Sequence, residues 1–208
     1  MRCGAASNCR IARNVKVRMR DGVDLSTTVI LPVKKGKYPA VLIRSAYNRV
    51  GSITDSYAKL GMALVVQDCR GRYDSGGDWW PFVNEPNDGV DTLEWILRQE
   101  WSDGKIGMQG ASYLAATQFL SVKGGGAKML HALNPQFMTN DCWRRAYYSD
   151  GAFSLGLTWS WLCFECSART SEASSMPLFD VSNLLRELPI VSLDEKSGAG
   201  QVPFYRDY

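Results

Sequence analysis

The pattern of apolar and polar residues changes its period several times along the first two thirds of the chain. In "VKVRMR" (15–20), apolar and charged residues alternate with a period of two, which is typical of a strand with one face in solvent. Other short runs, such as "MALVVQD" (62–68), are almost entirely apolar, as in strands that are covered on both faces. Together these patterns predict strands over 15–20, 26–32, 39–45, 62–68, 104–110 and 128–135.

Helical spacing separates the later strands. The segment "EPNDGVDTLEWILRQEW" (85–101) places its apolar residues three and four positions apart, with Asp88 as a candidate N-cap. A second helix is predicted over "SYLAATQFLSV" (112–122), and the glycines at 124–126 end it. The first two strands form an antiparallel hairpin, and the strand–helix alternation that follows predicts an α/β fold with a mostly parallel sheet.

The residue composition and the apolar pattern of the sequence change after Pro135. Residues 141–168 are dense in Trp, Tyr and Phe and show no further strand pattern. We therefore predict a sheet-bearing domain over 1–140 and the start of a helical lid over 141–208.

Composition and charge narrow the class of protein. The 208 residues are 45% hydrophobic, enough for one sizeable core, and the net charge of +3 is too small to indicate a nucleic-acid partner. No run approaches the roughly 18 apolar residues of a membrane span, and the first residues lack the apolar stretch of a secretion signal. We expect a cytoplasmic protein without nucleic-acid or membrane partners; the sequence does not indicate its oligomeric state.

The six cysteines do not form the pattern of a small disulfide-rich protein. Cys163 and Cys166 have CxxC spacing, but a second CxxC and a nearby histidine, which would complete a zinc site, are missing from the sequence. Buried free thiols are favoured, with metal or redox use as the alternative. We expect no metal and no cofactor.

The stretch "GMQGASYLAA" (107–116) is the main candidate for chemistry. Ser112 lies between a predicted strand and a predicted helix, where a serine is either an ordinary N-cap or the nucleophile of a hydrolase. Small residues before it, Gly110 and Ala111, suit the sharp turn of a nucleophile. In the strict G-x-S-x-G pattern a second glycine follows, and this chain has Leu114 there. The backbone N–H of Tyr113 would be one donor to an oxyanion.

Further segments carry a family resemblance. They are, in chain order, "VRMRDGVDLSTTVILP", "RSAYNR", "YAKLGMALVVQDCRGRYDSGGDW", "DTLEWILRQEWSDGKIGMQGASYLA" and "HALNPQF". This set resembles the X-Pro dipeptidyl-peptidase and cocaine-esterase family of α/β-hydrolases, from about Val15 to Pro135 and more loosely to Tyr208. The serine motif of that family is commonly G-x-S-Y, as it is here.

The resemblance implies an α/β-hydrolase fold and a serine hydrolase that cleaves ester or amide bonds through an acyl-enzyme. It implies that Ser112 is the nucleophile. It also implies that Tyr47, in "RSAYNR", donates its hydroxyl to an oxyanion hole shared with the Tyr113 N–H. Asp68, Arg70 and Gly71 are expected to support a loop, where they could bind each other; direct contact with the substrate is the alternative.

The acid and base of a serine hydrolase are not evident in this chain. Its one histidine, His131, lies in "KMLHALNP", a strand predicted to be buried, where the side chain would point into packing. We therefore expect an incomplete chain that lacks its acid and base and is, by itself, nearly inactive and prone to aggregate through an uncovered sheet edge. The alternative is a non-catalytic α/β-hydrolase-like scaffold or interaction protein.

The aromatic stretch offers candidates for substrate binding. Tyr147 and Trp161, with Tyr148 and Trp159, either line an acyl or leaving-group pocket or form the packing of the lid. The expected substrate is a small-molecule ester, amide or peptide. Because Arg144 and Arg145 would oppose an ammonium group, an ester or amide without a free amine is favoured.

Overall fold

The computed structural model describes residues 9–162, 183, 185–196, 202 and 205. The chain divides into two compact units, Met1–Met138 and Thr139–Tyr208. Each unit is described by itself, and the roles given to segments 1–140 and 141–208 stay predictions. Cys163 and Cys166 lie outside the described residues.

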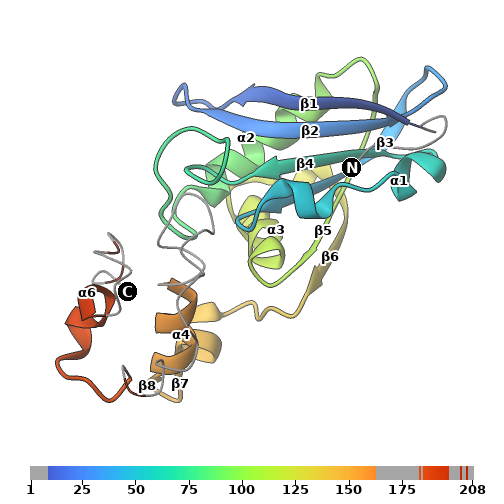
Figure 1. The fold of residues 1–208 in the computed structure, drawn as a ribbon. Coiled ribbons are helices and arrows are strands. Elements are labelled where there is room, and N and C mark those ends of the chain that lie inside the picture. Colours follow the sequence, from blue (N-terminus) through green and yellow to red (C-terminus); the bar gives the residue numbers. More distant parts are fainter. Residues whose placement is uncertain (1–8, 163–182, 184, 197–201, 203–204, 206–208) are drawn as a thin grey trace. The chain divides into compact units, whose positions relative to one another are not determined.

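The first unit is built on one six-stranded sheet with the order β1-β2-β4-β3-β5-β6 (Figure 1). β2 is antiparallel to β1 and to β4, whereas the pairs β3–β4, β3–β5 and β5–β6 are parallel. This confirms the predicted fold class, a mostly parallel sheet with an antiparallel hairpin at its start. The strands are β1 (Cys9–Arg18), β2 (Asp24–Pro32), β3 (Tyr38–Ser45), β4 (Ala63–Asp68), β5 (Ser102–Ala111) and β6 (Leu130–Gln136).

Helices connect the parallel strands. They are α1 (Ser56–Lys59), α2 (Glu85–Leu97) and α3 (Tyr113–Lys123), with the 3-10 turns η1 (Arg49–Ser52) and η2 (Gly126–Met129). α2 starts earlier than predicted, with Asn84 at its N-cap and Pro86 in its first turn, a position that favours proline. The prediction that Asp88 caps this helix is therefore wrong, because Asp88 lies inside the helix and its buried carboxylate binds Arg70.

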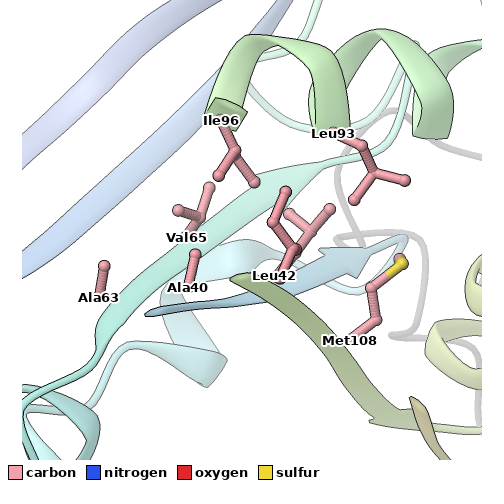
Figure 2. Packing of buried hydrophobic residues seen from close by; sticks show 8 residues of the cluster. Ala40, Leu42, Ala63, Val65, Leu93, Ile96 and Met108 are labelled. Carbon is pink, nitrogen blue, oxygen red and sulfur yellow. The ribbon is translucent and has the colours of Figure 1, made fainter. Parts of the chain in front are cut away.

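Two apolar clusters cover the two faces of the sheet, which explains the continuous apolar runs of β3 and β4. Leu42 and Val65 belong to one cluster, together with Leu93 and Ile96 of α2 (Figure 2). Their neighbours along the two strands belong to the other, since successive side chains of a strand point to opposite faces. That cluster consists of Cys9, Ile30, Ile43, Ala58, Leu64 and Val66.

β6 differs from its prediction as a buried strand. Within the described residues it pairs only with β5, and His131, Ala132, Leu133 and Asn134 are exposed. The expectation that His131 points into packing is wrong for the same reason. An apolar sequence shows that a strand suits burial, but it does not show whether another element covers it.

The second unit contains short elements. They are the π-helical turn η3 (Trp143–Tyr147), β7 (Tyr148–Ser149), β8 (Ala152–Phe153), α4 (Leu155–Ser160), η7 (Ile190–Ser192) and α6 (Leu193–Lys196). β7 and β8 pair as a small hairpin, so the prediction of no strand after residue 140 is wrong. Asp150 and Gly151 between them both have positive φ, as a type I′ hairpin turn requires. In the described segments, none of the helices has the length and apolar character needed to cross a membrane.

The cluster under α2 predicts a large difference between two substitutions in the sheet unit. Leu42→Ala removes a fully buried side chain from the central strand and should lower the free energy of unfolding by about 2–5 kcal/mol. The control Val33→Ala, at a position that is 56% exposed, should change it by no more than about 0.5 kcal/mol. Urea unfolding followed by circular dichroism measures both, and equal losses would contradict this description of the core.

Candidate active site

Ser112 lies in a strained turn between β5 and α3. β5 ends at Ala111 and α3 begins at Tyr113, with Ser112 between them at φ 57° and ψ −126°. A positive φ is uncommon for a residue other than glycine and costs energy that the surroundings must supply. Here the Ser112 N–H donates to the Gln136 carbonyl at the end of β6 (2.9 Å), which holds the turn in place.

Gly110 is required by the same turn. Its φ is 147°, and a Cβ added there would lie 2.3 Å from Cβ of Leu114. Leu114 itself packs against the apolar cluster on β3 and β4. The side chain at 114, where the strict motif has glycine, is therefore accommodated because residue 110 has none.

The Ser112 side chain does not act as a helix cap. Its residue is exposed, and the side chain makes no capping hydrogen bond with the first turn of α3. Its Oγ instead lies 3.4 Å from the hydroxyl oxygen of Tyr47. The ordinary explanation for a serine before a helix, an N-cap bond to the backbone, thus does not account for this residue.

The loop that carries Tyr47 is fixed to the end of β4. The Arg49 backbone N–H donates to Asp68 (2.6 Å), and the Arg49 guanidinium forms ion pairs with Asp68 and Asp74. Burial raises the pKa of the Asp68 carboxyl, and the bonds from Arg49 offset part of that effect. The expectation that Asp68 and Arg70 bind each other is wrong, since Arg70 instead binds Asp88 and Asp21.

Tyr113, the first residue of α3, has a fully buried side chain. Its hydroxyl donates to the Glu85 carboxylate (2.9 Å) and accepts from the Phe82 backbone N–H (2.9 Å). Burial, together with the negative charge of Glu85, raises the pKa of this phenol well above its usual value. The phenol is therefore a donor at neutral pH. The backbone N–H of Tyr113 is at a helix position that has no acceptor within the helix.

A buried ion-pair group lies behind Tyr113. Glu85 Oε2 is 2.5 Å from Arg44 Nη1, and both side chains are almost fully buried. Burial is the largest single influence and disfavours the Arg44 charge, but the combined attraction of Glu85, Asp88 and other neighbouring groups raises the pKa of the guanidinium. Sequence reasoning missed Glu85 and Arg44, although a charged residue near the end of the apolar run "PAVLIRS" was a signal for a buried partner.

His131 lies far from Ser112. In the register of β5 and β6, Leu130 pairs with Ile106 and Gln136 with Ala111, so His131 lies at the start of β6, beside the middle of β5 and five to six residues along the strand from Ser112. At ~3.3 Å per residue the separation is about 15–20 Å. The His131 Nδ1 accepts from the Ile106 backbone N–H at 3.4 Å. This arrangement excludes His131 as the base for Ser112.

The predicted substrate-binding residues Tyr147 and Trp161 lie in the second unit. Their rings are neighbours, with centroids 6.5 Å apart, and both residues are half-buried. Their role in substrate binding stays a prediction. Across the described ranges, no three His, Cys, Asp or Glu side chains come together as metal ligands do.

Comparison with known proteins finds a family and a relative that agree with each other. The sequence model of X-Pro dipeptidyl-peptidase (S15 family) matches residues 21–183. The cocaine esterase of Rhodococcus sp. (strain MB1 Bresler) is 33% identical over 205 residues, which cover 94% of this chain and 35% of that protein.

Solved structures show the same fold. An α-amino acid ester hydrolase matches with a TM-score of 0.77 and 24% identity, over 100% of this chain and 38% of that one. An aminopeptidase from the marine sediment archaeon Thaumarchaeota archaeon matches with a TM-score of 0.75 and 20% identity, over 96% and 37%. The chain thus spans little more than a third of the length of these relatives.

The backbone of Ser112 predicts an unusual preference for glycine. Ser112→Gly should unfold with a free energy about 1 kcal/mol higher than Ser112→Ala, because relief of the positive φ exceeds the entropy cost of glycine. At Ser56, the first residue of α1, the order should be reversed, with alanine the more stable. Thermal or urea unfolding of the four variants decides, and a Ser112→Gly protein less stable than Ser112→Ala would contradict the strained turn.

Proposed function

Because the chain belongs to the X-Pro dipeptidyl-peptidase (S15) family, we propose that it carries the nucleophile and oxyanion hole of a serine hydrolase of ester or amide bonds. Ser112 Oγ attacks the carbonyl carbon, and the leaving alcohol or amine departs to give an acyl-enzyme that water hydrolyses. The Tyr47 hydroxyl and the Tyr113 N–H stabilise the oxyanion of each tetrahedral intermediate.

One observation carries this proposal. The Ser112 hydroxyl is exposed at a strained strand-to-helix turn, makes no capping bond, and has the Tyr47 hydroxyl at 3.4 Å. An energetically costly backbone conformation around an exposed hydroxyl is typical of a functional site. The N-terminus of α3 adds the favourable field of its dipole for a developing negative charge.

The general base and its carboxylate partner are proposed to come from residues beyond those of this chain. His131 is its one histidine and lies about 15–20 Å from Ser112 along the strands. Without a base the serine hydroxyl is a weak nucleophile. The 208 residues alone are therefore expected to give little turnover.

The proposed substrate is a small ester, amide or peptide without an ammonium group near the scissile bond. Tyr147 and Trp161 are proposed to contact its acyl or leaving group. The second unit holds a cavity of about 790 Å³ bordered by Arg144, Arg145 and Asp150. Its two cationic side chains against one carboxylate support the proposed preference for a substrate without a positive charge.

A non-catalytic scaffold is the second candidate. The observation that favours it is the position of His131, because the chain offers no other imidazole. In that case the strained turn at Ser112 would be kept although the serine takes part in no reaction.

Covalent labelling distinguishes the two functions. In the longest protein that the gene encodes, a fluorophosphonate probe should label the wild type, and Ser112→Ala should abolish the labelling because the nucleophilic oxygen is gone. Ser56→Ala, which removes another exposed hydroxyl, should leave labelling unchanged. Labelling that persists in Ser112→Ala would place the nucleophile elsewhere, and a folded wild type without labelling would favour the scaffold.

The Tyr47 hydroxyl has its own test in ester hydrolysis. Tyr47→Phe should lower kcat by about 10²–10³, the usual effect of losing one oxyanion donor, with little change in KM. Steady-state kinetics with a nitrophenyl ester, on the longest protein that the gene encodes, measures both constants. The control is Tyr57→Phe, a half-buried tyrosine on α1. A Tyr47→Phe protein with unchanged kcat would remove this residue from the oxyanion hole.

A further inference from the structure

We propose that Glu85 is a positioning residue that acts through the Tyr113 phenol to fix the first turn of α3 against the Tyr47 loop. The proposal rests on the function proposed above, because it explains how the two oxyanion donors keep their spacing around residue 112. Among the described residues, Glu85 bonds to Arg44 and Tyr113, and it makes no hydrogen bond with Ser112 or with the Tyr47 hydroxyl.

The link begins at the Tyr113 side chain. Its hydroxyl bridges the Glu85 carboxylate and the Phe82 N–H, both at 2.9 Å, and its ring packs edge-on against Tyr47 with centroids 6.5 Å apart. The proposed donor N–H belongs to the same residue. A side chain held at its far end and packed along its length restricts the rotation of that backbone as well.

The link continues from Glu85 into the sheet. Glu85 Oε2 lies 2.5 Å from Arg44 Nη1, and Arg44 Nε donates to Gln67 Oε1 on β4 (2.9 Å). Arg44 stands on β3, three residues before Tyr47. The chain Tyr113–Glu85–Arg44 therefore connects the start of α3 to the strand that leads into the Tyr47 loop.

The buried charged groups of this link destabilise the fold unless each of them keeps its partner. A buried carboxylate and a buried guanidinium lose hydration, which only a close pairing with further hydrogen bonds offsets. A phenylalanine at position 113 would retain the ring packing without burying a hydroxyl. The hydroxyl thus contributes a directional bond that ring packing alone does not supply.

A thiol at position 112 can report this positioning without any catalysis. In Ser112→Cys the sulfur lies between the Tyr47 hydroxyl and the N-terminus of α3, two features that stabilise a thiolate. Alkylation by iodoacetamide across pH, read by mass spectrometry of the peptide that contains position 112, gives the pKa of the introduced thiol separately from the six native cysteines. The measurement needs no turnover, and it uses the longest protein that the gene encodes.

The direction in which the alkylation rate changes distinguishes an effect of positioning from an effect of charge alone. Glu85→Gln removes a negative charge, which by Coulomb attraction and repulsion alone would lower the thiol pKa and speed alkylation. Loss of positioning weakens both stabilising features and slows alkylation at neutral pH by about three- to tenfold, the factor of one net hydrogen bond. We expect slower alkylation in Ser112→Cys combined with either Glu85→Gln or Tyr113→Phe.

Matched controls come from the same unit. Glu94→Gln, at an exposed position of α2 that pairs with Arg98, and Tyr57→Phe on α1 should leave the alkylation profile of the introduced thiol unchanged. Circular dichroism confirms that each variant is folded. If Glu85→Gln does not fold, the Tyr113→Phe variant tests the proposal, since it keeps the aromatic ring at 113 and the Glu85 carboxylate.

Two outcomes would overturn the proposal. An unchanged alkylation profile of the introduced thiol in Tyr113→Phe would show that the link is only structural. Unchanged or faster alkylation in a folded Glu85→Gln variant would show that Glu85 has no positioning effect or acts by its charge alone. Failure of fluorophosphonate labelling at Ser112 would instead reject the hydrolase function, and it is read in a separate experiment.

Discussion

The arrangement around Ser112 depends on a buried ion pair between Glu85 and Arg44. The two groups come from the first turn of α2 and from β3, and Glu85 also accepts from the phenol of Tyr113 at the start of α3. Three elements therefore meet at one carboxylate. Removing one partner of such a pair leaves an uncompensated buried charge, typically at a cost of about 3–5 kcal/mol. Because disrupting this group is so unfavourable, it holds the strained turn at Ser112 and the Tyr47 loop in fixed positions relative to each other.

Much of the sheet could be predicted from the sequence, because the relevant signals are local. The apolar runs of β3 and β4 reflect packing on both faces, and the small residues before Ser112 reflect a turn in which Gly110 can hold no side chain. The exposure of β6 could not be predicted. Its sequence is apolar, but exposure depends on what packs beside it, and in the described residues it is an edge strand.

The site was only partly predictable for a related reason. The resemblance to a known family brought Ser112 and Tyr47 together, and the structure has their oxygens 3.4 Å apart. Spacing alone did not reveal which of the 21 acidic residues would meet which of the 24 basic ones. Glu85 and Arg44 are 41 positions apart, and Arg70, the partner of Asp88, lies 18 positions before it, beyond the range of the local signals that suggest a helix cap. Buried charge pairs are set by tertiary structure.

The central claim is that Ser112, Tyr47 and Tyr113 form a nucleophile with a pre-arranged oxyanion hole. A crystal structure of the gene product after reaction with a fluorophosphonate tests it most directly. We predict a phosphorus–oxygen bond to Ser112 Oγ, with one phosphonyl oxygen about 2.7–3.1 Å from both the Tyr47 hydroxyl and the Tyr113 backbone nitrogen. An adduct on another residue, or a phosphonyl oxygen turned away from both donors, would contradict this claim.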